Sequence, residues 1–464
     1  MRNPMFVFDD KTADLVLGYC RDRLALDPVP LDFGGYATPL HDVFDGLISE
    51  VGNDPARVLE LFATHLATAV ISSDSPRFVS FIPAAPTKAS LLFDMVVSSS
   101  SLHATSWLEA AGAVAAENQV LGVLAGLAGL PAGAGGCFVS GGSAANLSAL
   151  MVGRDTASVR GHETDRPKFA VTEEAHSSVG KALRVLGVEP FLVEADDHRL
   201  TGDALEAALA SGRPGAADVV GVVATAGTTN AGLVDDLAGI GAVAARRGLW
   251  FHVDGAYGGG ALFAPSVRRL FEGIELADSL VVDPHKWLFG PYDCAALLYR
   301  QPALAKAVHT QDAAYLDVIH EALRTDGAAA GPHRADEPWN PTDYAYHLSR
   351  RARGLPLWFS LAVHGTNAYR DAVESALANA REAARIIEST PYLELVREPT
   401  LSIVLFRRRG WARADYEAWS ARLLADQVAF VTPTTWEGEA TARLAILHPD
   451  TTSDIVREIV GTMA

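Results

Sequence analysis

Cysteine is scarce in this chain of 464 residues, which has only Cys20, Cys137 and Cys294. So few cysteines exclude a fold held together by a disulfide framework and indicate a reducing compartment. Basic residues are outnumbered, with 38 Lys and Arg against 56 Asp and Glu, which argues against general nucleic-acid binding because that needs a basic surface. The first residues lack the apolar stretch of a secretory signal, so we expect a cytoplasmic protein.

Long apolar runs, internal repeats and low-complexity tracts are absent too. The longest uncharged stretch, 118–153, is broken by Pro131 and by many glycines, so it predicts a buried helix, a turn and a strand and not a membrane span. The fourteen histidines show no tight ligand spacing, so we expect no metal. What the chain does have is 49% hydrophobic residues, enough for a large core and too many for a disordered protein.

Seven short apolar runs predict the strands of a central sheet. They do not alternate with polar residues, so each should be covered on both faces, as in a parallel sheet. Helical patterns such as 235–247 lie between them and give the βαβ rhythm of an α/β domain. The predicted strands are 136–139, 169–171, 191–193, 219–225, 249–254, 279–283 and 294–299.

The pattern divides the chain into three segments. Residues 1–85 predict a helical segment with proline-rich connections, and 86–355 predict the large α/β domain. Residues 356–464 predict a small α+β domain, with a helix at 357–388 and strands at 401–406 and 442–446. Within the large domain, the stretch 311–342 is a long loop, which is typical of functional or mobile segments.

Lys286 follows the predicted strand 279–283 directly. Pro284 ends that strand, so the lysine lies at the edge where α/β sheets place ligands. Burial at such a position lowers the pKa of a lysine and makes it a candidate Schiff-base nucleophile. A solvated turn lysine is the competing interpretation, and for a lysine without partners it is the commoner one.

Asp254 ends another predicted strand, 32 positions before the lysine. A carboxylate there can pair with a cationic ring nitrogen, which is what pyridoxal phosphate requires. Its pyridinium accepts electrons only while it is protonated, and a nearby anion favours that form. An ordinary Asp-Gly turn is the alternative.

Three further strand ends carry groups suited to the same cofactor. Ser140 to Asn146 place glycines and a hydroxyl at the start of a helix, where free N–H groups can bind phosphate. His176 follows the strand 169–171 and can stack on a flat ring, and hydroxyls follow 219–225. Because the carboxyl ends of parallel strands meet at one edge, we expect all five groups in one crevice.

Together these motifs resemble the pyridoxal-phosphate-dependent group II amino-acid decarboxylases, and most closely the aromatic-L-amino-acid decarboxylase branch. The most specific part is the pair of stretches 252–257, His-Val-Asp-Gly-Ala-Tyr, and 283–287, Asp-Pro-His-Lys-Trp. The resemblance implies the type I, aspartate-aminotransferase-like fold and pyridoxal 5′-phosphate as cofactor. It also implies a homodimer whose N-terminal helices wrap the partner.

The resemblance assigns roles to individual residues. Lys286 would hold the cofactor aldehyde covalently, with Asp254 at the ring nitrogen and His176 stacked on the ring. The other assigned positions are His285 beside the lysine, Gly142 and Ser143 at the phosphate, Thr229 and Ala256 at the cofactor walls, and Arg350 at the active site. Tyr315, in the long loop, matches a mobile tyrosine that protonates the substrate carbon once CO2 has left.

The substrate end departs from the aromatic branch. Phe81 and Ile82 lie in a segment that usually carries more aromatic residues, and His103 and Thr105 replace apolar pocket residues. The resemblance therefore implies decarboxylation of an L-amino acid to its amine, with an aromatic substrate first and a polar one, histidine or glutamate-like, as the alternative.

Two competing functions stay open beside this one. Some relatives couple decarboxylation to oxidative deamination and release an aldehyde, but their loop tyrosine is typically phenylalanine, so Tyr315 argues against that outcome. A dinucleotide-binding oxidoreductase would rely on the glycine pattern at 239–244, which lies inside a predicted helix and not in a strand-to-helix turn.

Overall fold

The computed structural model describes residues 3–32, 40–83, 85–321 and 338–464. They form two compact units. The large unit comprises Ala84–Arg381 and Glu398–Val404, and the small unit comprises Met1–Pro83, Glu382–Arg397 and Leu405–Ala464. The three-segment division expected from the sequence stays a prediction.

A seven-stranded sheet forms the centre of the large unit, in the order β1-β7-β6-β5-β4-β2-β3. β7 is antiparallel to both of its neighbours, and the other pairings are parallel. All seven strands predicted from the sequence are present, so the α/β architecture is confirmed. They are β1 (Gly135–Val139), β2 (Lys168–Val171), β3 (Glu189–Leu192), β4 (Val219–Thr225), β5 (Trp250–Asp254), β6 (Ser279–Val282) and β7 (Ala295–Tyr299).

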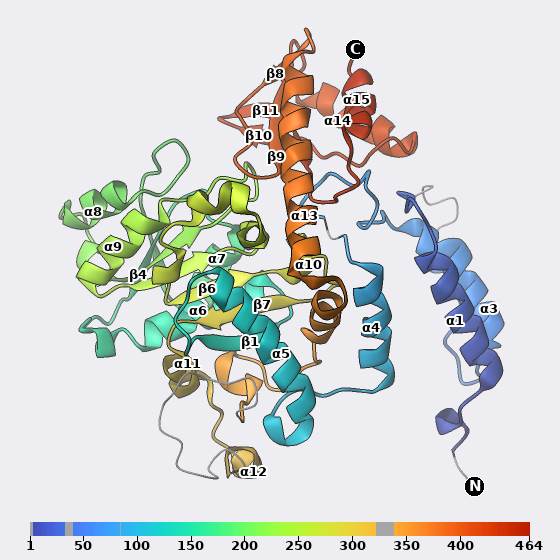
Figure 1. Cartoon of the computed structure of the whole chain (residues 1–464), viewed down its shortest axis with the longest axis horizontal. Helices are drawn as coiled ribbons and strands as arrows, with labels where there is room; N and C mark the ends of the chain where they lie inside the picture. Colours follow the sequence, from blue (N-terminus) through green and yellow to red (C-terminus); the bar gives the residue numbers. More distant parts are fainter. Residues whose placement is uncertain (1–2, 33–39, 84, 322–337) are drawn as a thin grey trace. The chain divides into compact units, whose positions relative to one another are not determined.

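Helices surround this sheet (Figure 1). Polar side chains at the N-caps fix where several of them start. Ser106, Thr201 and Asp236 each accept a hydrogen bond from the backbone N–H three residues on, which satisfies a donor that the helix itself leaves free. The helices are α4 (Lys88–Ser99), α5 (Trp107–Leu127), α6 (Gly142–Asp155), α7 (Ser177–Val185), α8 (Gly202–Ala210), α9 (Leu237–Arg247), α10 (Pro284–Trp287), α11 (Pro302–His309), α12 (Asp317–Glu321) and α13 (Leu355–Glu388).

The sheet is buried on both faces, as the unbroken apolar runs predicted. Every residue of β1, β4, β5, β6 and β7 is buried. Phe138, Phe169, Trp250 and Leu297 are among the fully buried side chains of this core. With both faces covered, the open ends of the strands are where polar groups can gather.

In the described part of the chain, α5 alone has the length and composition of a membrane span. Its buried residues include Glu117, whose carboxylate makes two hydrogen bonds of 2.7 Å to the guanidinium of Arg350. Glu117 also accepts the backbone N–H of Gly354. A buried ion pair of this kind is typical of a helix packed inside a protein, because an unpaired carboxylate would be costly there.

The small unit contains a four-stranded sheet in the order β10-β11-β9-β8. Its strands are β8 (Leu393–Leu395), β9 (Ile403–Arg408), β10 (Thr434–Trp436) and β11 (Glu439–Ala445). The predicted strands 401–406 and 442–446 correspond to β9 and β11 with shifted ends, and β8 and β10 were not predicted. Its helices are α1 (Asp10–Leu24), α2 (Leu40–Phe44), α3 (Pro55–Leu61), α14 (Arg413–Ala425) and α15 (Ser453–Gly461).

The three cysteines are all free and differ in exposure. Cys137, in β1, is buried, and burial raises the pKa of its thiol to about 12. Burial likewise raises the pKa of Cys294, just before β7, well above its ordinary value. Cys20, on α1, is partly exposed.

Candidate active site

One cavity of the large unit, with a volume of about 320 Å³, lies at the carboxyl ends of β1, β2, β4, β5 and β6. The turns after these strands line it, as the parallel topology led us to expect. The structure thus brings together eight residues that the sequence singled out: Gly142, Ser143, His176, Thr229, Asp254, Ala256, His285 and Lys286. Their individual roles stay predictions.

Lys286 lies on the short helix α10, and its amine is paired with a carboxylate. Its Nζ is 2.9 Å from Oδ2 of Asp283, the residue that follows β6. Asp283 is buried and also accepts the backbone N–H of Gly142 at 3.1 Å. The other oxygen of Asp283, Oδ1, is buried without a hydrogen-bond partner among the described residues, so this carboxylate can accept a further proton donor.

The shift that the sequence predicted for the pKa of Lys286 has the wrong direction. Burial does lower the pKa of this amine, but the carboxylates of Asp283 and Asp254 outweigh burial, and the pKa is raised from its ordinary value of 10.5. The sequence argument considered desolvation alone. A lysine beside a buried carboxylate keeps its proton instead, because the anion favours the charged amine.

Asp254, at the end of β5, accepts two hydrogen bonds from groups of the large unit. Its Oδ2 accepts Nδ2 of Asn146 at 2.8 Å, and its Oδ1 accepts the backbone N–H of Ala256 at 3.1 Å. Donors aimed at a carboxylate favour its charged form. An anion fixed in this way at the cavity wall suits a protonated ring nitrogen.

Gly142 starts α6 at the other end of the cavity. A Cβ at this position would lie 2.9 Å from Oδ2 of Asp283 and 3.1 Å from Cβ of Ala256, so the close approach of the chain requires glycine. Its N–H is used by Asp283. The phosphate-binding capacity of this helix start therefore depends more on Ser143, which is exposed in the cavity.

Two histidines flank the lysine and the carboxylate. His176 caps α7, with Nδ1 accepting the N–H of Ser178 and lying 2.8 Å from its Oγ. His285 Nδ1 lies 2.6 Å from the carbonyl oxygen of Cys294, and burial lowers the pKa of His285. Both rings are held by local contacts at the cavity, as a stacking or proton-transferring role requires.

Other predicted residues do not line this cavity. Tyr315 is 71% exposed, in the turn before α12. Arg350 is buried and paired with Glu117, and its expected role at the substrate stays a prediction. His103 and Thr105 are bonded to each other at 2.8 Å.

Phe81 and Ile82 belong to the small unit, where Phe81 is exposed and Ile82 is buried. Their expected role at the substrate stays a prediction.

The cavity also contains functional candidates that the sequence reasoning missed. Asp283 was seen only as part of the lysine motif, and Asn146 only as the end of a glycine-rich turn. The signal for Asn146 was its spacing: four residues after Gly142, it lies on the same face of α6. Nothing local to the sequence shows that its amide reaches Asp254.

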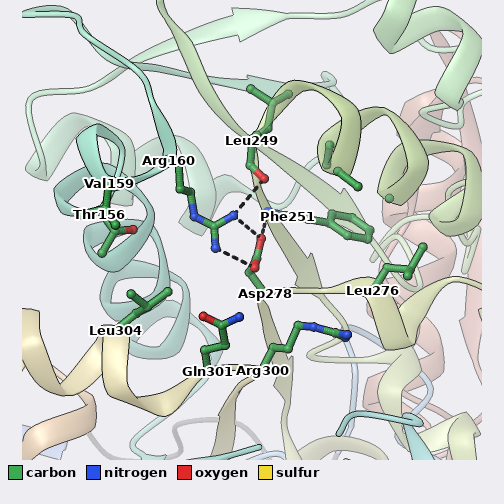
Figure 2. Close-up of a pocket in the computed structure, with 14 residues that line it drawn as sticks. Thr156, Val159, Arg160, Leu249, Phe251, Leu276, Asp278, Arg300, Gln301 and Leu304 are labelled. Carbon is green, nitrogen blue, oxygen red and sulfur yellow. Dashed lines mark hydrogen bonds and ion pairs between the residues drawn. The ribbon is translucent and has the colours of Figure 1, made fainter.

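A second cavity of the large unit, about 460 Å³ in volume, lies at the amino ends of β5 and β6. Figure 2 shows the guanidinium of Arg160 bonded to both oxygens of Asp278, at 2.7 and 3.1 Å. Asp278 also accepts the backbone N–H of Phe251 at 2.8 Å. None of the residues predicted for catalysis lines this cavity, and its central ion pair fixes the start of two strands.

A comparison with protein families matches residues 43–409 to the pyridoxal-dependent decarboxylase conserved domain. Among curated relatives, an aromatic-L-amino-acid decarboxylase of Bacillus atrophaeus is 29% identical over 89% of this chain and 85% of its own length. An L-2,4-diaminobutyrate decarboxylase of Rhizobium meliloti (strain 1021) is 34% identical over 80% of this chain and 74% of its own. The crystal structure of Oryza sativa TDC with PLP and tryptamine superposes with a TM-score of 0.87 at 23% identity, covering 100% of this chain and 99% of that one.

The chain belongs to the pyridoxal-dependent decarboxylase family and has the type I fold of pyridoxal-phosphate enzymes. It is a carboxy-lyase that uses pyridoxal 5′-phosphate and acts on an amino acid. The cavity fits that cofactor on its own evidence: an amine, a fixed carboxylate, an imidazole and a helix start lie within one space. Other relatives, a histidine decarboxylase of Rattus norvegicus and a 3,4-dihydroxyphenylacetaldehyde synthase of Aedes aegypti, are 27% and 26% identical, so membership leaves the substrate side chain open.

Proposed function

We propose that this enzyme removes CO2 from an aromatic L-amino acid and releases the corresponding amine. The observation that carries the proposal is the cavity in which Lys286, Asp254 and His176 lie together. The choice of an aromatic side chain is supported by the Bacillus relative, which matches over most of both chains. The sequence resemblance leads to the same choice.

Each side chain has a distinct task in this reaction. When bound, pyridoxal phosphate accepts the electron pair that departing CO2 leaves behind. Lys286 would hold the cofactor aldehyde covalently. Asp254 would balance the charge at the ring nitrogen, and His176 would cover the ring. Asp283 holds the ammonium proton of Lys286, 2.9 Å away, and takes up that proton when the amine must react.

Tyr315 supplies the last proton in this proposal, to the substrate carbon. It lies outside the cavity in the described conformation and is exposed, so the step requires the tyrosine to approach the substrate. Protonation at this carbon gives the amine, and the tyrosine is the residue that argues against aldehyde release.

A polar amino acid is the second candidate substrate. The diaminobutyrate relative is 34% identical, a higher value than that of the other relatives reported above. His103 also forms a polar cluster with Thr105 and Glu109, with ring-to-oxygen distances of 2.8 and 3.2 Å. His103 and Thr105 stand where the family resemblance leads us to expect apolar pocket residues.

One experiment tests the function and separates the candidates. The enzyme with added pyridoxal phosphate is incubated with single L-amino acids, and amine, aldehyde, ammonia and peroxide are measured. We expect amine from phenylalanine, tyrosine, tryptophan or DOPA, and none from Lys286→Ala, which should also lose the visible cofactor band. Amine from histidine, glutamate or diaminobutyrate alone would replace the aromatic proposal, and aldehyde with peroxide would replace the amine.

We further propose a homodimer in which the first helices pack on the second copy. α1 buries none of its residues within the chain, and just before it Phe6 and Phe8 are 80% and 78% exposed. Apolar surface of this kind marks protein interaction sites. Light scattering should give twice the chain mass of 49.2 kDa, and a single-chain mass at micromolar concentration would contradict the dimer.

A further inference from the structure

A chain of buried hydrogen bonds runs from the start of β5 to the cofactor cavity. Trp250 Nε1 donates to Ser279 Oγ at 2.9 Å, and that oxygen lies 2.8 Å from Nδ1 of His252. On the other side of the ring, His252 Nε2 lies 2.9 Å from Oδ1 of Asn146. The amide nitrogen of Asn146 then donates to Asp254 at 2.8 Å. All five side chains are buried.

The carboxylate end of this chain fixes the direction of its last two bonds. A carboxylate can only accept, so the amide nitrogen of Asn146 donates to Asp254 and its Oδ1 accepts the Nε2–H of His252. The indole N–H of Trp250 can only donate, to Ser279 Oγ. When His252 is neutral, its Nδ1 carries no hydrogen and accepts the hydrogen of Ser279, so that every donor points toward Asp254.

The surroundings of His252 keep it in that state. Burial lowers the pKa of its imidazole to about 4, although Asp254 opposes the change. A protonated His252 would present a second N–H to Ser279 Oγ, which already accepts the N–H of Trp250, and the hydrogen of Ser279 would then lose its acceptor on the ring. The neutral ring is thus the form that all four hydrogen bonds select, over the ordinary pH range.

Asn146 also connects to the histidine that covers the ring. Its Nδ2 donates to Ser178 Oγ at 3.0 Å, and that oxygen lies 2.8 Å from Nδ1 of His176. One amide group therefore contacts the two parts of the site that flank the cofactor ring. If the amide were turned over, its oxygen would face Asp254 and repel it, and His252 prevents this by donating to that oxygen.

We propose that Asn146, oriented by His252, is a positioning residue that keeps the carboxylate of Asp254 aimed at the cofactor ring nitrogen, and that it couples this carboxylate to His176. The proposal rests on the assignment of Asp254 to that nitrogen. The residues that transmit the effect, Ser279 and Trp250, have no contact with the cofactor cavity of their own.

The test uses the holoenzyme reconstituted with pyridoxal phosphate labelled with ¹⁵N in its ring. The ¹⁵N chemical shift reports directly whether that nitrogen carries a proton. Asn146→Leu keeps the size of the side chain but removes both N–H donors. In this variant we expect the pH of half-protonation to fall by about one to two units, which corresponds to the free energy of one hydrogen bond to a charged group. The cofactor dissociation constant should rise roughly 10- to 100-fold for the same reason.

Ser148→Ala is the matched control, because Ser148 is also a buried polar residue of α6 but bonds only to backbone groups, of Ala144 and Tyr346. It should leave the half-protonation pH of the ring unchanged. A half-protonation pH in Asn146→Leu equal to that of the wild type would overturn the proposal, even if the variant melts at a lower temperature, since that result describes a purely structural residue.

A second variant keeps the test decisive if Asn146→Leu does not fold. His252→Gln removes the ring behind the amide without touching Asp254, and we expect a smaller change of the half-protonation pH in the same direction; no change would again overturn the proposal.

Failure of the proposed function looks different. In that case Lys286→Ala would keep the cofactor band, or no amino acid would give a product.

Discussion

Asp283 changes the chemistry expected of Lys286 more than any other single residue. Its carboxylate lies 2.9 Å from the amine and helps raise the pKa of Lys286. A protonated amine cannot attack an aldehyde, so attachment of the cofactor must wait for this proton to leave. The strength of the ion pair thus controls the pH at which the enzyme takes up its cofactor.

Asp283→Asn should lower the pKa of Lys286, because the amide keeps the contact with Gly142 but loses the charge. We expect cofactor attachment to the cofactor-free enzyme to reach half its maximal rate about one pH unit or more below the wild type, the change that an opposite charge at this distance produces. Stopped-flow absorbance across a pH series measures it. Asp155→Asn, a loss of one carboxylate on the surface of α6, is the control, and an unchanged or raised midpoint in Asp283→Asn would contradict the prediction.

Tyr315→Phe tests the proton donor. The variant should bind cofactor as the wild type does but form amine about 100-fold more slowly or worse, since general-acid catalysis contributes factors of this size. Amine is counted by mass spectrometry, together with any aldehyde. Tyr346→Phe, another exposed tyrosine of the same unit, serves as control. Amine formation at the normal rate in Tyr315→Phe would remove this residue from the mechanism.

At the scale of elements, the start of α6 packs tightly against the turns that follow β5 and β6. Gly142→Ala would place a methyl group 2.9 Å from Asp283, and overpacking of this kind costs about 1–3 kcal/mol. We expect cofactor affinity to fall at least about fivefold, measured by titration of the cofactor-free enzyme. Gly180→Ala, inside α7 with no atom near its Cβ, should stabilise the helix by roughly 0.5–1 kcal/mol and leave affinity unchanged. Equal effects of both variants would contradict the close approach.

The strands were predictable because burial on both faces leaves unbroken apolar runs. β4 has the predicted bounds, 219–225, and the other six strands of the large sheet lie within two residues of theirs. Helix starts were less predictable: α6 begins at Gly142, inside the stretch 140–146, and its first turn is built from small residues without apolar periodicity that would mark the exact start. α13 is broken at Gly365, where φ is +75°, a position at which the sequence shows only a glycine inside a helical pattern.

The candidate site was predictable where a motif follows a strand, and not where two distant elements meet. Asp254 ends a strand, and Lys286 and His176 lie in the segments that follow strands, so the sheet topology brings them together. The contact of Asn146 with Asp254 depends on how α6 packs against β5. The pKa of Lys286 depends on a carboxylate whose orientation only the folded chain defines, and Arg350 is paired with a residue 233 positions away.

At the scale of the whole molecule, buried titratable groups make stability depend on pH in opposite directions. His252 has a folded pKa of about 4, below its ordinary value, so its contribution is complete above about pH 6.5 and is lost as the pH falls toward 4. Burial raises the pKa of Asp235 to about 7, so this group stabilises the fold increasingly as the pH falls to that value and below it. The wild-type curve therefore mixes both effects.

His252→Gln isolates the histidine. Between about pH 7 and pH 5, the wild type should lose about 2 kcal/mol of unfolding free energy that the variant does not lose, from the separation of the two pKa values. Urea unfolding of both cofactor-free proteins at the two pH values measures the difference. If the difference in unfolding free energy between the wild type and His252→Gln is the same at both pH values, that result would contradict a neutral, buried His252.

The burial of Cys137 and Cys294 leaves Cys20 as the one cysteine that is partly exposed. A maleimide dye at mild pH should therefore attach once per chain, on α1, without entering the reaction cavity. If α1 does pack on a second copy, energy transfer between two such dyes gives a direct optical signal for assembly in solution. The enzyme thus carries its own labelling position, and no engineered thiol is needed.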